Sequence, residues 1–168
     1  HMAPSLNRIL VPTDFSETAD VALAYAKQLA TKMGASLHLL HVFTDPYAVA
    51  ACAPEVYAAV PPEARERARD GAHQRLFERL DSIEEQRFRG TRGMVRGLTA
   101  PQIVDYAVSQ DIDLIVMGTH GRRGVAHLLL GSVAEHVVRT AACPVLTVRA
   151  DHRVAEEQVE ERPRAAAA

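Results

Sequence analysis

The chain has 168 residues, enough for one domain with a sizeable core, and 48% of them are hydrophobic, an ordinary fraction for a globular protein. Its formal net charge of −2 argues against a dedicated nucleic-acid-binding protein, because such proteins are usually basic with a clustered patch. The two cysteines, Cys52 and Cys143, lack the spacing of metal ligands, so a reduced, cytoplasmic protein is expected. Neither a secretory signal nor an apolar run of membrane-spanning length is visible, so no membrane association is expected.

The first part of the chain has a strand–helix–strand pattern. The apolar run at 8–11 predicts a strand, which Pro12 ends. Ser16 is the expected N-cap of a helix whose apolar residues recur at helical spacing, and Gly34 is its expected C′ residue. The run at 37–43 is apolar almost throughout, which predicts a second strand that helices cover on both faces.

Two histidines lie within the second predicted strand. His38 and His41 are three residues apart, so their side chains are expected on opposite faces of the sheet. A metal ion shared between them is therefore not expected.

The middle of the chain is irregular and then strongly charged. Residues 44–62 contain four prolines and predict an irregular insertion, interpreted as a variable surface loop or as a lid over a ligand. A charged helix is expected from Glu63, and its arginines alternate with acids, which favours a solvated face over a nucleic-acid surface. Residues 93–97 predict a short third strand. The expected apolar stripe of the charged helix comprises Ala64, Ala68, Leu76, Leu80 and Ile83.

The last part of the chain alternates two helices with two strands. Thr99 and Gln102 match a capping box that begins a helix. A buried strand is expected at 112–117, a helix at 132–142 and a fifth strand at 145–148. The buried face of the first of these helices is expected to comprise Ile103, Val104, Ala107 and Val108.

Five strands alternating with four helices predict a doubly wound, Rossmann-like α/β fold, a parallel sheet with helices on both faces. We expect one domain at 7–149, preceded at 1–6 by a tag remnant and a short lead. A charged tail at 150–168 has no core-forming pattern and is expected to be disordered. In such folds, ligands bind beyond the carboxyl ends of the strands, where the strand order reverses.

A glycine-rich loop follows the fourth predicted strand. Gly118, Gly121 and Gly124 supply positions for positive φ or for close approach of the backbone. Gly131 and Ser132 then open a helix, and Ser132 begins a second match to a capping box. Taken singly, these features are more often turns or caps, but together they direct backbone N–H groups and a helix N-terminus to one point. That arrangement suits a phosphate group.

The same residues carry a family resemblance. Gly118, Gly121, Gly131 and Ser132 match the G-x2-G-x9-G-[ST] signature, so the chain resembles the ATP-binding universal stress proteins, and ILVPTDFS near the start adds to the likeness. The resemblance implies the strand order 3-2-1-4-5, with the ligand crevice between strands one and four. It also implies a homodimer through strand 145–148, which agrees with the apolar residues on both faces of that expected edge strand.

Strand ends provide the candidates for the nucleoside part of the ligand. Asp14 is expected to accept hydrogen bonds from ribose hydroxyls or to hold Mg²⁺ near the phosphates, and its alternative role is to cap the turn before Ser16. The expected apolar wall for adenine consists of Pro12, Thr13, Val42 and Met117. The alternative for the methionine and the valine is an ordinary core position.

The glycine loop provides the candidates for the phosphates. Backbone N–H groups are expected to bind them, and the Ser132 hydroxyl adds a donor. Arg122 and Arg123 are candidates for neutralising charge, with simple solvation as their alternative, and the resemblance implies a polar contact to phosphate or ribose for His120. The backbone donors are those of Gly121, Gly131, Ser132 and Val133, next to Gly118 at the strand end.

Residue patterns of common catalytic sites do not stand out in the sequence. We therefore expect a cytoplasmic protein that binds ATP or another adenine nucleotide and responds by changing its contacts with a regulatory protein partner, which the sequence does not identify. One alternative is a slow Mg²⁺-dependent ATP hydrolase or nucleotidyl-transferring enzyme. Another is an interaction module that keeps the fold without the ligand.

Overall fold

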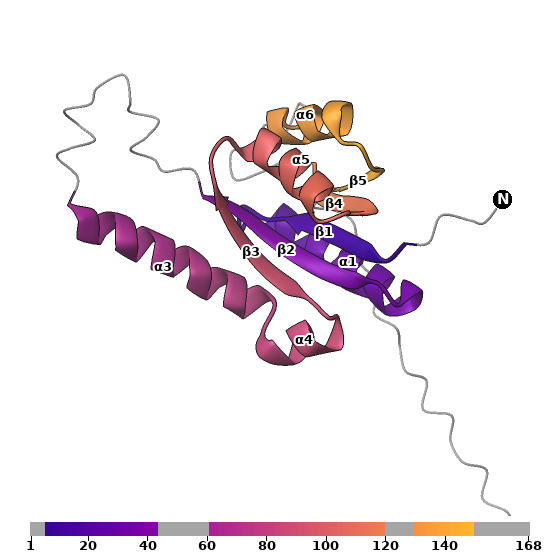
Figure 1. Ribbon diagram of the computed structural model, residues 1–168, viewed down its shortest axis with the longest axis horizontal. Helices are drawn as coiled ribbons and strands as arrows, with labels where there is room; N and C mark the ends of the chain where they lie inside the picture. Colours follow the sequence, from indigo (N-terminus) through magenta and orange to yellow (C-terminus); the bar gives the residue numbers. More distant parts are fainter. Residues whose placement is uncertain (1–5, 44–60, 120–129, 150–168) are drawn as a thin grey trace, which may run out of the picture.

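The computed structural model describes residues 6–43, 61–119 and 130–149. Its five strands form one parallel sheet in the order β3-β2-β1-β4-β5 (Figure 1). The predicted fold class and strand order are therefore confirmed. The strands are β1 (Arg8–Pro12), β2 (Ser36–Phe43), β3 (Thr91–Arg96), β4 (Leu114–Gly118) and β5 (Val145–Val148). The helices are α1 (Glu17–Met33), α3 (Pro62–Arg79), α4 (Ser82–Arg87), α5 (Thr99–Ser109) and α6 (Ser132–Thr140).

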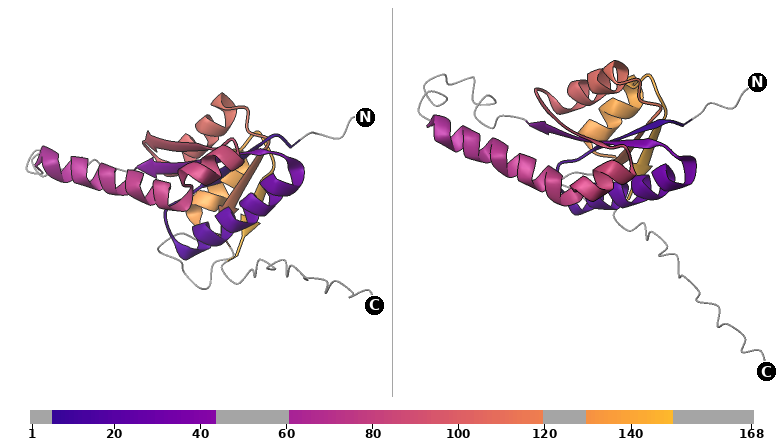
Figure 2. Two further views of the ribbon diagram at one scale, coloured as in Figure 1. Left: turned by 90° about the horizontal axis from the view of Figure 1, so that it is seen from below. Right: turned by 60° about the horizontal axis from the view of Figure 1, so that its bottom comes forward.

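Helices cover both faces of the sheet. Figure 2 shows α1, α3 and α4 on one face and α5 and α6 on the other. Leu39 of β2 belongs to the core beneath the first group, whereas the next residue, Leu40, belongs to the core beneath the second. Because consecutive strand residues point to opposite faces, a sheet covered on both sides needs strands that are apolar throughout. This requirement explains why β1, β2 and β4 are apolar over most of their length.

The predicted ends of α1 are confirmed. The Ser16 hydroxyl oxygen accepts a hydrogen bond from the Ala19 amide at 3.3 Å, as an N-cap does. Gly34 has φ 67° at the other end, and its amide bonds to the carbonyl of Ala30. The chain can therefore reverse directly into β2, because glycine adopts this left-handed conformation without steric cost.

The charged helix differs from the prediction. It ends at Arg79, and a second helix, α4, follows, because Asp81 caps a new helix by accepting hydrogen bonds from the Ile83 and Glu84 amides, both at 2.9 Å. The predicted apolar stripe is wrong at Ile83, which is 78% exposed, and at Ala68, which is also exposed. The described residues thus contain five helices, where four were expected.

Helix α3 extends beyond the sheet. In Figure 1 and Figure 2 its first turns project away from the strands, and residues 66–71 are all exposed. Burial begins at Ala72 and continues at Leu76, which packs into the core shared with α1. Only the second half of α3 therefore anchors it.

Helix α5 also departs from the sequence prediction in two details. Ile103 and Ala107 are buried as predicted, but Val108 is 60% exposed because it lies about 140° around the helix from Ile103. The expected capping box is also wrong: the Gln102 amide bonds to the carbonyl of Leu98 at 3.1 Å, and Leu98 is the N-cap. Thr99 and Gln102 have the residue types of a capping box. The first carbonyl that accepts a hydrogen bond in the helix, however, belongs to Leu98, the residue before Thr99.

No helix of the described segments combines the length and hydropathy needed to cross a bilayer.

Candidate functional site

The carboxyl ends of β1 and β4 lie side by side at the centre of the sheet. The two strands pair in parallel, with Ile9 opposite Leu114 and Leu10 opposite Ile115. From this point, the chain adds β2 and β3 on one side and β5 on the other. In a doubly wound sheet with this strand order, the ligand crevice is expected between the end of β1 and the end of β4.

Backbone hydrogen bonds bring the start of α6 to this crevice. The Gly131 amide donates to the carbonyl of Thr119 at 2.7 Å, and the Thr119 amide donates to the carbonyl of Val148 at 2.9 Å. The two ends of the predicted glycine loop are thus joined beside β4 and β5. The structure brings together Gly118, Gly131 and Ser132, as the sequence spacing indicated.

Ser132 is the first residue of α6, and it does not cap the helix. Gly131 is the N-cap, in an extended conformation, and as a glycine it has no side chain that could cap the helix. The Glu135 amide bonds to the carbonyl of Gly131 at 2.8 Å, so the predicted capping box is wrong. The first amides of a helix have no partner within it, and they form the positive end of its dipole.

Gly118 is required by close packing. A Cβ atom added there would lie 2.8 Å from Cγ2 of Thr18 and 3.2 Å from the carbonyl carbon of Thr18. Among the described glycines, positive φ occurs at Gly34 and Gly97, so Gly118 does not serve a left-handed turn. It allows the start of α1 to lie directly against the end of β4.

The β1–α1 loop forms a compact turn. The Phe15 amide donates to the Thr13 hydroxyl oxygen at 3.0 Å, and the Ser16 amide donates to Oδ1 of Asp14 at 3.0 Å. Asp14 therefore does cap the turn before Ser16. A carboxylate accepts several hydrogen bonds, so this contact is compatible with a second role in ligand binding.

The residues predicted to form the adenine wall are buried at the same strand ends. Val42 and Met117 are 7% and 5% exposed and share one core cluster beneath α5 and α6, and Thr13 is 6% exposed. Pro12 is also buried. Their burial suits both interpretations made from the sequence, a core position and an apolar wall.

Part of the predicted phosphate contact lies in the glycine loop, and His120, Gly121, Arg122 and Arg123 lie outside the described residues. Val133 is half-buried at the start of α6, one residue after Ser132.

The sequence analysis missed residues that hold the β1–α1 loop. The Phe15 ring packs on His41 of β2, and Arg79 of α3 lies over it. His41 could be recognised only as a histidine facing away from His38, and Arg79 only as one of several helix arginines. The position of Arg79 depends on how α3 packs on the rest of the protein, and no local sequence pattern indicates this packing.

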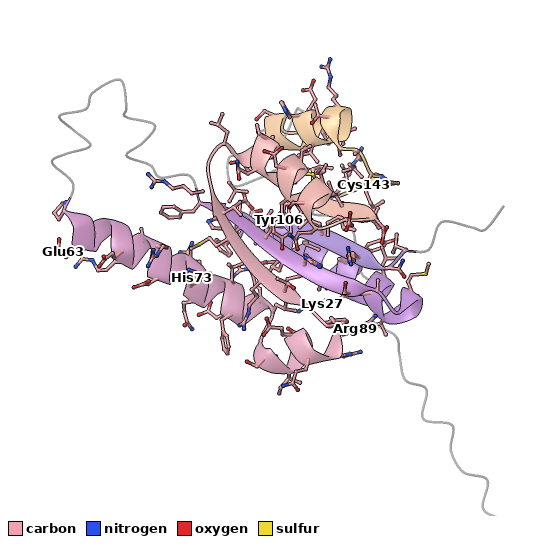
Figure 3. All side chains as sticks on the ribbon, in the orientation of Figure 1. Lys27, Glu63, His73, Arg89, Tyr106 and Cys143 are labelled. Atoms are coloured by element: carbon pink, nitrogen blue, oxygen red, sulfur yellow. The ribbon has the colours of Figure 1, made fainter. Side chains whose placement is uncertain are left out.

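The titratable groups with shifted pKa values lie elsewhere. Burial, with a smaller effect from Arg8, lowers the pKa of His38, whose Nδ1 lies 3.2 Å from the Tyr106 hydroxyl, and burial raises the pKa of Tyr106. Burial also raises the pKa of the Cys143 thiol, so it remains protonated at neutral pH. Figure 3 labels Tyr106 and Cys143. In the described part of the chain, no cluster of three or more histidine, cysteine, aspartate or glutamate side chains forms a metal site.

A separate cavity of about 490 Å³ lies between α3, α4 and β3 and contains none of the predicted site residues. Arg92 crosses it, with its Nη2 2.8 Å from Oε2 of Glu85 and its guanidinium over the Phe77 ring. The cavity is lined by Asp70, His73, Gln74, Leu76, Phe77, Glu85 and Arg92.

Comparison with known proteins agrees with this architecture. The universal stress protein family matches residues 5–149. Universal stress protein MJ0577 of Methanocaldococcus jannaschii is 30% identical over 158 residues, which cover 88% of this chain and 98% of the relative. A solved structure of MJ0577 has a TM-score of 0.75 and covers 89% of this chain and 100% of its own. A universal stress protein of Thermus aquaticus is 33% identical over 147 residues, covering 84% of this chain and 97% of the relative.

A further solved structure shares the fold at lower identity. It is the universal stress protein from Archaeoglobus fulgidus in complex with dAMP, which is 22% identical, has a TM-score of 0.59 and covers 86% of this chain and 99% of its own. The family match over most of the sequence, the relatives at 30% identity or more, and the observed strand order agree. The chain therefore belongs to the universal stress protein family.

Proposed function

We propose that this protein binds an adenine nucleotide, with ATP as the first candidate, in the crevice between β1 and β4. The observation that carries the proposal is the 2.7 Å hydrogen bond between the Gly131 amide and the Thr119 carbonyl. It places the N-terminus of α6, whose N-cap is a glycine, beside the end of β4. Helix N-termini of this kind bind phosphate through backbone N–H groups and through the helix dipole.

The remaining site residues are assigned within this proposal. Backbone amides of Ser132 and Val133 and the Ser132 hydroxyl would bind phosphate, and His120, Gly121 and Arg122 would extend that contact. The Gly131 amide, predicted as a further donor, bonds to the Thr119 carbonyl and would instead hold the start of α6 in place. Pro12, Thr13, Val42, Met117 and Gly118 would line the adenosine part. The dAMP complex of the Archaeoglobus fulgidus protein supports the choice of an adenine nucleotide, since it has the same fold.

Asp14 is the proposed contact for ribose or for Mg²⁺. It lies at the carboxyl end of β1, and a carboxylate near phosphates is a typical Mg²⁺ ligand. The magnesium ion, when bound, would neutralise phosphate charge. Asp14 itself would orient the nucleotide through its oxygen atoms.

Isothermal titration calorimetry with ATP and MgCl₂ tests the site. Ser132→Ala is expected to weaken ATP binding by about tenfold or more, because a hydrogen bond to a charged group contributes about 1.5–3 kcal/mol. Thr140→Ala is the matched control: it removes a hydroxyl at the other end of α6, which bonds to the carbonyl of His136 at 2.8 Å, and should leave the affinity unchanged.

Stability should be the same in wild type and Ser132→Ala, because Ser132 does not cap the helix and alanine is a good helix former. Absence of binding by ATP, ADP and AMP, with and without MgCl₂, would overturn the proposal and favour a ligand-free interaction module. Single-turnover assays address the slow hydrolase: ATP hydrolysis above background that disappears in Asp14→Ala would add catalysis to binding.

We further propose that the nucleotide-bound protein regulates a protein partner in the cytoplasm. We also propose that it acts as a homodimer, in which β5 forms the contact between the two copies. The carbonyls of Pro144 and Val148 bond to β4, so the alternate residues, Val145 and Thr147, direct their backbone groups to the free edge of the sheet. A second copy could pair there.

Sedimentation analysis of Thr147→Pro tests the dimer. Proline removes an N–H donor from the free edge and leaves the hydrogen bonds to β4 in place. We expect a dimeric wild type and a folded, monomeric variant. A monomeric wild type at micromolar concentration would refute this part of the proposal.

A further inference from the structure

The loop between β1 and α1 contains a residue in an unusual backbone conformation. Phe15 has φ 65°, in the left-handed region that bulky L-residues rarely adopt. Such a conformation persists only where the surrounding contacts fix it. The contacts of Phe15 therefore identify what determines the shape of this loop.

Side chains from β2 and α3 pack on the Phe15 ring. The ring centroids of Phe15 and His41 are 4.4 Å apart, with an angle of 32° between the planes. The guanidinium carbons of Arg79 and Arg75 lie over the ring, 5.0 and 5.6 Å from its centroid. A cation above an aromatic ring is attracted by the negative charge of the ring face. Phe15 thus connects the loop to α3.

Arg79 is itself fixed by α1. Its Nε donates to Oδ1 of Asp20 at 2.6 Å and its Nη2 to Oδ2 at 3.1 Å, while Nη2 also donates to the carbonyl of Phe15 at 3.4 Å. A two-pronged contact of this type sets the orientation of a guanidinium as well as its position. Nζ of Lys27, which Figure 3 labels, donates to the carbonyl of Arg79 at 2.9 Å and to Glu84 at 2.6 Å. The end of α3 is therefore tied to α1 directly.

His41 fixes the other side of the loop. Its Nδ1 donates to the carbonyl of Thr13 at 2.8 Å. The Thr13 hydroxyl oxygen accepts from the Phe15 amide, and Asp14 accepts from the Ser16 amide. Thus the backbone on both sides of Asp14 is held, by β2 before it and by α1 and α3 after it.

We propose that Phe15 and Arg79 are positioning residues for the nucleotide site, and that they hold the loop at 13–16 in the conformation that directs Asp14 toward the crevice. This inference rests on the proposed function. It assigns to α3 a role in ligand binding that acts through the β1–α1 loop. A loop released from these contacts would populate the binding conformation less often, and the apparent affinity falls by the same fraction.

The test compares Arg79→Gln with Arg92→Gln. Both arginines form an ion pair and lie over a phenylalanine ring, and their side chains are 21% and 23% exposed. Arg92 contacts Phe77 and Glu85 and does not contact the loop. The control therefore removes the same kinds of interaction at a similar degree of burial.

Two measurements are made on each full-length variant. Amide hydrogen exchange of the nucleotide-free protein reports the protection of the Phe15 and Ser16 amides, and calorimetry with ATP and MgCl₂ reports affinity. For Arg79→Gln we expect these amides to lose nearly all of their protection and ATP binding to weaken about tenfold, as when the competent population falls to about one tenth. For Arg92→Gln we expect both to equal wild type. Arg79→Lys, which keeps the charge and loses the planar fork, should fall between them.

The outcomes separate this inference from the proposed function. Unchanged exchange in Arg79→Gln overturns the inference even if wild type binds ATP, and so does a nearly complete loss of protection with unchanged affinity. Equal losses of affinity in Arg79→Gln and Arg92→Gln also overturn it, because they would indicate a general effect of stability. If wild type binds no adenine nucleotide, the proposed function fails and the binding role of Arg79 fails with it, whereas hydrogen exchange still decides whether Arg79 holds the loop.

Discussion

Gly118→Ala provides a direct test of how closely α1 packs on β4. An added methyl group would lie 2.8 Å from Cγ2 of Thr18 and 3.2 Å from its backbone carbonyl carbon. Rotation of the Thr18 side chain relieves the first contact, but only a shift of α1 relieves the second. Overpacking of this kind costs about 1–3 kcal/mol, and we expect Gly118→Ala to lower the free energy of unfolding by about 2 kcal/mol.

Urea unfolding followed by circular dichroism measures this change. Gly71→Ala is the matched control, because Gly71 lies in exposed α3 with no atom within 4 Å of the added Cβ. There, alanine should stabilise the protein by about 0.5–1 kcal/mol through its higher helix propensity. The same substitution thus has opposite signs at the two positions.

A double-mutant cycle with Thr18→Ala identifies the cause. Removal of Cγ2 eliminates the closest contact, so Gly118→Ala should cost less in the Thr18→Ala background, with a coupling energy of at least about 0.5 kcal/mol. A stabilising effect of Gly118→Ala, or a cost that Thr18→Ala leaves unchanged, would refute the reasoning from close packing.

Three further predictions concern stability. Asp81→Ala removes the acceptor for two amides at the start of α4 and should lower the free energy of unfolding by about 0.5–2 kcal/mol in urea unfolding. Leu39→Ala creates a cavity at a fully buried position and should cost about 2–5 kcal/mol in the same assay. The folded protein binds a proton at His38 less readily than the unfolded chain, because burial lowers this pKa from its ordinary value of 6.5. Stability should therefore fall as pH decreases through 6.5, and thermal unfolding from pH 7 to 5 should show a smaller decrease in His38→Gln.

The proposed site combines segments that are far apart in the sequence but joined by short backbone hydrogen bonds. The start of α6 reaches the end of β4 through Gly131 and Thr119, and the end of β1 reaches β2 through the Thr13 amide and the Leu40 carbonyl at 2.8 Å. Rigid strand ends can thus position ligand contacts that come from loops.

Local patterns were sufficient to predict most of the secondary structure. Continuous apolar runs identified buried parallel strands, since both faces of each strand must be covered. Ser16 and Gly34 marked the ends of α1 because capping chemistry depends on a few adjacent residues. The spacing of Gly118, Gly131 and Ser132 likewise identified segments that meet in space, although their ligand contacts remain a proposal.

Where a pattern competed with its surroundings, the sequence was misleading. The capping box at Thr99 matched in residue type, but the helix begins with the carbonyl of Leu98. The sequence predicted that the apolar stripe of the helix from Glu63 extends to Ile83. In the structure, Asp81 caps a separate helix and Ile83 is exposed. These outcomes depend on which backbone hydrogen bonds the folded chain makes, and residue spacing alone does not specify that.

The sequence by itself determined the class of fold, the number of strands and the family, because these follow from hydrophobic periodicity and a local glycine spacing. Only the tertiary structure decided that Arg79, 64 residues from Phe15, completes the β1–α1 loop, and that Gly118 serves contact with α1. The physical reason is that such contacts arise when helices pack on the sheet. The sequence of a charged helix does not indicate which loop a given side chain will contact.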